Sequence, residues 1–136
     1  MLQRRGIVIA VVVLLAAVVP AIVISRSGDD DEPGPARLTA TWDESEGDPA
    51  CVYDAGSRSV EVKVVIDGEV PGDPVRMTVT VAAYADENTS REVGSATDSV
   101  QVEGTVHERM LLTFPVERAV HIDEDGVAAC RISSTY

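Results

Sequence analysis

Apolar and polar residues alternate along most of the chain after residue 37, and this period of two is typical of half-buried β-strands. Leu38, Ala40 and Trp42 share one face of the first such segment. Two longer segments repeat the pattern, with apolar residues at Val60, Val62, Val64 and Ile66 and then at Val75, Met77, Val79, Val81 and Ala83. No segment after residue 35 shows an apolar stripe of helical period, so we expect an all-β domain.

Turn-forming residues divide this region into about seven short strands. The stretch Val70–Pro74 contains Pro-Gly-Asp-Pro, which predicts a turn between the two long segments. Arg91–Glu103 predicts one or two strands with a break near Thr97, and the following strand ends at Pro115. Short strands are predicted at 51–53 and 120–122, and the last at 127–133. Turns at this spacing favour an antiparallel β-sandwich.

The N-terminal region has a different pattern, because Ile7–Ile24 contains eighteen residues and no charge. As a helix this run would be about 27 Å long, close to the thickness of a bilayer core. Arg4 and Arg5 precede it, and acidic residues follow it. The positive-inside rule therefore predicts a single-pass signal anchor with a cytoplasmic N-terminus and an extracytoplasmic C-terminal domain.

This pattern predicts four parts. They are a cytoplasmic tail (1–5), a transmembrane helix (6–25), an acidic flexible linker (26–36) and an extracytoplasmic domain (37–136). A cleaved signal peptide is the alternative, with Val19-Pro20-Ala21 as a poor cleavage site. A lipid anchor is excluded because the first cysteine is Cys51, far beyond the apolar run.

The chain is strongly acidic, with a formal net charge of −12. Such a surface repels phosphate backbones, so we expect no binding of nucleic acid. The only two cysteines are Cys51 and Cys130. An even number of cysteines outside the cytoplasm favours a disulfide, which would tie an early strand to the last one.

Candidate chemistry is sparse. His107 and His121 are the only imidazoles; they are not spaced as in a zinc finger, and we expect His107 on the outer face of a strand. The nucleophile elbow of hydrolases and the glycine-rich phosphate loop are both missing. The acidic groups at 43–48 and 123–125 fall in predicted turns, where turn chemistry explains them. We therefore expect no catalytic residues, no cofactor and no metal site.

Several short motifs after Cys51 resemble those of the small exported immunoglobulin-like domains of actinobacteria, akin to the FxLYD group. They are Cys51-Val52-Tyr53-Asp54, Tyr84-Ala85-Asp86 after a Val/Thr-rich strand, Val93-Gly94-Ser95-Ala96, Phe114-Pro115-Val116 and Cys130-Arg131-Ile132-Ser133-Ser134. The resemblance implies an immunoglobulin-like sandwich that follows a membrane or lipid anchor. The chain departs from the group at Val81–Asp86, where alanine replaces bulky residues, and Trp42 precedes both cysteines. The resemblance supplies no functional residues.

The sequence therefore predicts a membrane-anchored, non-catalytic interaction module that binds a protein or cell-envelope partner. One alternative is an accessory subunit that joins a membrane protein complex through the transmembrane helix. Another is a secreted β-sandwich protein, released after signal cleavage.

Overall fold

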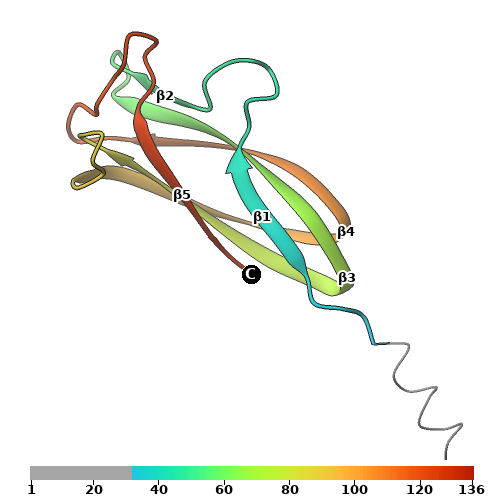
Figure 1. Cartoon of the computed structure of the whole chain (residues 1–136). Coiled ribbons are helices and arrows are strands. Elements are labelled where there is room, and N and C mark those ends of the chain that lie inside the picture. Colours follow the sequence, from blue (N-terminus) through green and yellow to red (C-terminus); the bar gives the residue numbers. More distant parts are fainter. Residues whose placement is uncertain (1–31) are drawn as a thin grey trace, which may run out of the picture. The chain divides into compact units, whose positions relative to one another are not determined.

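The computed structural model describes residues 32–136, and a compact unit spans Pro35–Tyr136 (Figure 1). The predicted tail, transmembrane helix and most of the predicted linker lie outside the described residues. Within residues 32–136, no helix is long and apolar enough to cross a membrane.

Five strands build the domain. They are β1 (Arg37–Trp42), β2 (Cys51–Asp54), β3 (Ser59–Tyr84), β4 (Glu92–Pro115) and β5 (Ala129–Thr135). Every pairing is antiparallel, and the described residues form no helix. The prediction of an all-β, antiparallel domain is confirmed.

A long hairpin of β3 and β4 forms the frame of the sheet, with pairs from Ser59–Pro115 at its open end to Tyr84–Glu92 near its turn. Its register shifts between Val70 and Val75, where four residues of β3 lie opposite the single Glu103 of β4. Two of the four are prolines, which lack the N–H that a sheet ladder needs. A local disruption of this kind bends a strand without ending it.

The bend divides the hairpin into two parts. We call residues 59–70 with 104–115 the first half and residues 75–84 with 92–102 the second half. β1 and β2 pair with the first half, whereas β5 pairs with the second half. Figure 1 shows both long strands turning back at the same end of the domain.

Contacts between the two ends of β4 show how closely the hairpin folds over. Gly94 lies near the start of this strand, yet a Cβ built on it would be 2.7 Å from the carbonyl oxygen of Pro115 at its end. Because real Cβ atoms do not approach an oxygen this closely, the absence of a side chain at Gly94 lets the two ends pack together. Glu117 also donates its backbone N–H to the carbonyl of Val93.

The core lies between the two halves and consists mainly of valine. Its fully buried members alternate along β3 as the sequence predicts: Val60, Val62, Val64, Ile66, Met77, Val79, Val81 and Ala83. β4 contributes Val102, Val106, Leu112 and Phe114. No polar or charged residue is buried within the described part of the chain. The branched Cβ of valine packs well on a pleated surface, which explains how a core with few aromatic residues fills this space.

The predicted disulfide is confirmed. Cys51 in β2 and Cys130 in β5 are bonded, with their Cα atoms 6.5 Å apart. Because β2 pairs with the first half and β5 with the second, this bond links the two halves directly.

The structure differs from the predicted strand pattern in four places, one of which is the short strand predicted at 120–122, where Ile122 forms only an isolated bridge with Ala128. The turn predicted at Val70–Pro74 is a bend within β3, and β4 continues through Thr97 without a break. β5 begins at Ala129 rather than Val127, which forms only an isolated bridge with Val52. The number of strands is therefore five rather than about seven, because two strands each extend through both halves.

Candidate functional site

The loop between β1 and β2 spans Asp43–Ala50 and is hydrogen-bonded to β3 at both of its ends. One residue holds both of its ends: Asp43 donates its N–H to the carbonyl of Lys63, and the N–H of Lys63 donates to the carbonyl of Ala50. Inside the loop, Gly47 donates to the carbonyl of Glu44 and has a φ of 79°, which suits glycine. We call this segment the β1–β2 loop; its closely spaced ends are typical of a compact surface loop.

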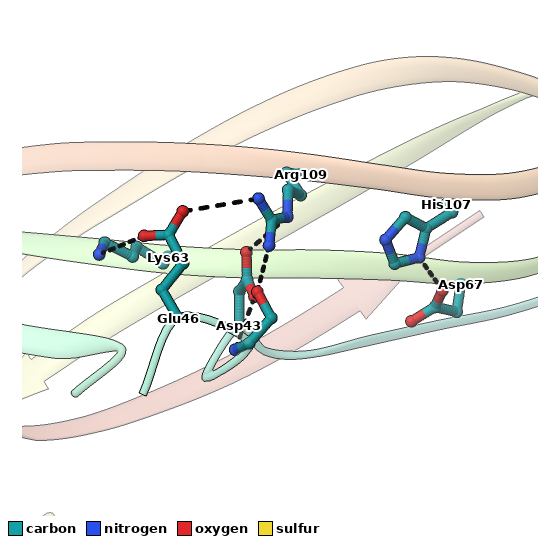
Figure 2. Close-up of polar contacts among 7 residues, drawn as sticks. Asp43, Glu46, Lys63, Asp67, His107 and Arg109 are labelled. Atoms are coloured by element: carbon teal, nitrogen blue, oxygen red, sulfur yellow. Dashed lines mark hydrogen bonds and ion pairs between the residues drawn. The ribbon is translucent and has the colours of Figure 1, made fainter. Parts of the chain in front are cut away.

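Side chains from β3 and β4 hold one side of this loop against the sheet (Figure 2). The guanidinium of Arg109 lies 3.1 Å from Asp43 Oδ2 and 3.7 Å from Glu46 Oε1, and it also donates to Ser45 Oγ. Lys63 Nζ lies 3.5 Å from Glu46 Oε2. Two cations therefore neutralise two acids of the β1–β2 loop, and a network of this kind orders a loop better than a single exposed pair does.

Asp43 is the centre of this network, with a side chain only 10% exposed. Its Oδ1 accepts hydrogen bonds from the backbone N–H of Ser45 at 3.2 Å and from the Ser45 hydroxyl at 2.6 Å. These bonds lower the pKa of the Asp43 carboxyl below its ordinary value of 3.8, and the nearby charges of Arg109 and Lys63 lower it further. Asp43 is therefore a fixed anion that shapes the start of the loop.

The other side of the β1–β2 loop lines an open cleft of about 540 Å³. Trp42, Pro49, Ala50, Val127, Ala128 and both half-cystines give this cleft its apolar surface, and Gly47 also lines it. Glu44 and Asp48 are its two acidic lining residues, and none of the basic residues between 32 and 136 lines it. Its size falls within the usual range for ligand sites, which is roughly 300–1,000 Å³.

The four acids of the β1–β2 loop thus have two different roles. Asp43 and Glu46 pair with Arg109 and Lys63. Glu44 and Asp48 line the cleft and form no ion pair with any residue between 32 and 136. The two acids of the loop that line the cleft are therefore the two without an ion pair among the described residues.

A second, neighbouring cleft of about 450 Å³ extends this acidic region. Asp48 and Pro49 line both clefts. The second one also contains Asp54, Glu61 and Asp125, with Lys63 as its one basic lining residue. The combined surface attracts cations and repels anions over the range of a Debye length.

The two histidines lie apart from this loop, and each contacts a carboxylate. His107 Nδ1 is 2.6 Å from Asp67 Oδ1, and the His107 side chain is 70% exposed, so its predicted position on an outer face is confirmed (Figure 2). His121 Nε2 is 2.7 Å from Glu87 Oε1. Within residues 32–136, no group of three or more His, Cys, Asp or Glu side chains is placed to hold a metal ion.

The acidic groups predicted to form turns do so. Asp123 Oδ1 accepts the N–H groups of Asp125 and Val127 at 3.0 and 2.8 Å. Asp43 accepts that of Ser45 in the same way. Such bonds from a carboxylate to the backbone just after it are the usual reason for aspartate in turns.

The outer face of the second half is rich in hydroxyl groups. The hydroxyls of Thr78 and Ser99 are 2.9 Å apart, as are those of Thr80 and Thr97. β5 extends the two rows, because Thr135 lies opposite Thr78 and Ser133 opposite Thr80. This hydroxyl face carries no ion pair in the described part of the chain.

Sequence reasoning did not identify Arg109, Lys63 or the cleft beside Trp42. Two signals were present: Lys63 is the only lysine, and Arg109 is a cation at an outward position of a strand in a very acidic chain. Neither signal shows that the β1–β2 loop folds back over these side chains, because that contact joins residues 64 positions apart.

Comparisons with models of known protein families, with curated proteins and with solved structures found no match for this chain.

Proposed function

We propose that this chain is a membrane-anchored, non-catalytic extracytoplasmic interaction module, and that the β1–β2 loop is its contact surface for a protein or cell-envelope partner. The observation that carries this proposal is the division of the loop's acids. Arg109 and Lys63 pair with Asp43 and Glu46, whereas Glu44 and Asp48 form no ion pair with a described residue and line the cleft together with Trp42. A loop held on a rigid sheet is the usual place for recognition residues.

The proposal of a membrane anchor is based on the uncharged run Ile7–Ile24 and on Arg4 and Arg5 before it. The disulfide between Cys51 and Cys130 suits the same location, because thiols oxidise outside the cytoplasm. We also propose that the bent sheet is an immunoglobulin-like sandwich of the exported kind, with its two halves as the two layers and the disulfide between them.

Cross-linking in intact cells tests the contact surface. A photo-reactive amino acid replaces Thr41, which is exposed beside the loop, and in a matched chain it replaces the exposed Gln101 of the second half. We expect a specific cross-linked partner from position 41 and none from position 101. Partner capture from position 101 alone would contradict the assignment of the β1–β2 loop.

The accessory-subunit alternative places the contacts in the apolar segment instead. To separate the two, residues 1–36 are fused to an unrelated inert domain and expressed in cells that lack the native chain. The interaction-module proposal predicts that this fusion fails to restore the wild-type phenotype. Full restoration by the anchor alone would support the subunit alternative, and a mature protein that begins after Ala21 would support a secreted form.

A further inference from the structure

The cleft beside the disulfide combines an aromatic wall with two anions. Trp42 is half-buried at the end of β1, and its packing against the core restrains its position. Val127, Ala128 and the half-cystines Cys51 and Cys130 complete the apolar lining. Cys51 belongs to β2, which pairs with the first half, and Cys130 to β5, which pairs with the second, so the cleft depends on the folded hairpin.

The two anions of this cleft lack a partner cation within the described residues. Glu44 and Asp48 are exposed, whereas Lys63 and Arg109 form their ion pairs with Asp43 and Glu46 of the same loop. The hydrogen bond from Gly47 to Glu44 and the backbone bonds at Lys63 hold the loop in this conformation. The backbone positions of Glu44 and Asp48 at the cleft are thus fixed.

An indole surface with carboxylates at its side is the chemistry that recognises an organic cation. A tryptophan ring attracts an ammonium or guanidinium group through its negative face, and carboxylates accept the N–H bonds of that group. Aliphatic carbons next to such a charge suit the valine, alanine and disulfide lining. Lysine and arginine side chains combine both features.

We propose that this cleft binds a lysine or arginine side chain presented by a partner protein. This inference rests on the proposed function and specifies the partner's chemistry. Charge complementarity supports it, because the chain carries a net charge of −12 and the neighbouring cleft adds Asp54, Glu61 and Asp125. Such a field draws a basic segment toward the cleft and speeds its association.

The direct test uses Trp42 as its own reporter, because it is the only tryptophan in the chain. The full chain in detergent micelles is titrated with acetyl-Ala-Lys-Ala-amide, its arginine equivalent and its norleucine equivalent. We expect a saturable change in Trp42 emission with both basic peptides, weaker at high salt, and none with norleucine. No response to the basic peptides would overturn the proposal. Equal affinity for tetramethylammonium would also overturn it, in favour of a free organic cation.

A pair of matched variants tests the role of the carboxylates. Glu44→Gln with Asp48→Asn removes two charges from the cleft, and Glu103→Gln with Glu108→Gln removes two exposed charges from β4. We expect the first pair to raise the Kd of the lysine peptide at least about tenfold and the second to change it less than about twofold. Equal weakening by both pairs would show an effect of net charge alone and overturn the proposal.

The same variants, placed in the cross-linking experiment at position 41, separate this inference from the proposed function. Loss of the cross-link in Glu44→Gln with Asp48→Asn supports the cation site. A cross-link retained in that variant overturns the cation site and leaves the interaction module intact. If the chain without these substitutions captures no partner from position 41, that result contradicts the proposed contact surface itself, whatever the cleft binds.

Discussion

The two halves of the hairpin are alike on their inner faces and different on their outer faces. Each half presents a row of fully buried apolar side chains to the common core, such as Ile66 in the first half and Met77 in the second. The outer face of the first half carries ion pairs and supports the β1–β2 loop. The outer face of the second half carries hydroxyl rows and no ion pair between described residues.

This difference shows which positions the fold constrains. Inner positions must be apolar in both halves, because a buried charge without a partner is very costly. Outer positions are free of that requirement, so the contrast between charged pairs and hydroxyl rows does not follow from folding. The following experiments test this difference between the two halves.

The largest effects are expected from the shared core. Ile66→Ala and Met77→Ala each remove a side chain with no exposure, so we expect each to lower the free energy of unfolding by about 2–5 kcal/mol. Urea denaturation followed by circular dichroism should show one transition for both variants. The control Leu111→Ala removes a side chain that is 62% exposed and should change stability by less than about 0.5 kcal/mol. Two separate transitions would show that the halves unfold independently.

Loss of the disulfide should have the next largest effect on stability, because this bond links the two halves across 79 residues of chain. In the chain-entropy model, closing a loop of this length stabilises by about 3–4.5 kcal/mol. Cys51→Ser with Cys130→Ser should remove this stabilisation and therefore lower the melting temperature. Reduced wild-type protein is the matched control and should melt at the same temperature as the variant. If reductant also lowers the melting temperature of the variant, its effect does not come from this bond.

A smaller effect is expected from the cation that holds the β1–β2 loop. Arg109→Met keeps the aliphatic stem but loses the contacts with Asp43, Ser45 and Glu46, so we expect about 1 kcal/mol of destabilisation. Faster hydrogen exchange at Gly47, whose N–H bonds within the loop, should accompany it. Arg76→Met in the second half is the control, since Arg76 forms no ion pair with a described residue. Equal effects of the two variants would remove the proposed difference between the halves.

Acid should affect both halves through hydrogen-bonded carboxylates. The pKa values of Asp43, Asp54 and Asp86 lie below 3.8, chiefly because of hydrogen bonds from Ser45, Ser57 and Ser90 respectively. A carboxyl whose pKa is lower in the folded state stabilises the fold above its unfolded pKa of about 3.9 and loses this contribution as pH falls through the folded pKa.

The stabilisation that these three carboxyls provide should therefore be constant down to about pH 5 and decline below it. Asp43→Asn and Asp86→Asn each remove one of the three carboxyls. Each variant should therefore lose less stability between pH 5 and pH 2 than the unaltered chain does, by roughly the share of that one carboxyl. Thermal unfolding at intervals between pH 2 and pH 6 measures this. A decline that begins near pH 6 would point to other groups and contradict the prediction.

The smallest effect is expected from the hydroxyl face. Thr80→Val with Thr97→Val replaces two bonded hydroxyls by methyl groups of the same shape, which should change stability by less than about 0.5 kcal/mol. Partner capture from position 41 should be unchanged. If capture is lost in this variant, the second half contributes to the contact surface and the comparison is reversed.

Local pattern was sufficient to predict the strands and the inner face. The period of two along Val60–Ile66 and Val75–Ala83 identifies which side chains enter the core, because neighbouring residues of a strand point to opposite faces. It could not show that Pro71–Pro74 bends a continuous strand, since the same residues also end strands. Gly68 illustrates the limit: a Cβ there would lie 1.9 Å from the carbonyl oxygen of Arg37, in a strand far away in sequence.

Four properties can be read from the sequence alone: the all-β class, the apolar faces of the strands, the acidity of the surface and the bonded pair of cysteines. These depend on composition and on spacing between near neighbours. Tertiary contacts, in contrast, pair Arg109 and Lys63 with Asp43 and Glu46. They leave Glu44 and Asp48 beside Trp42 and the disulfide. The reason is geometric: the loop and its supporting strands are brought together by the fold of the hairpin, which no local pattern encodes.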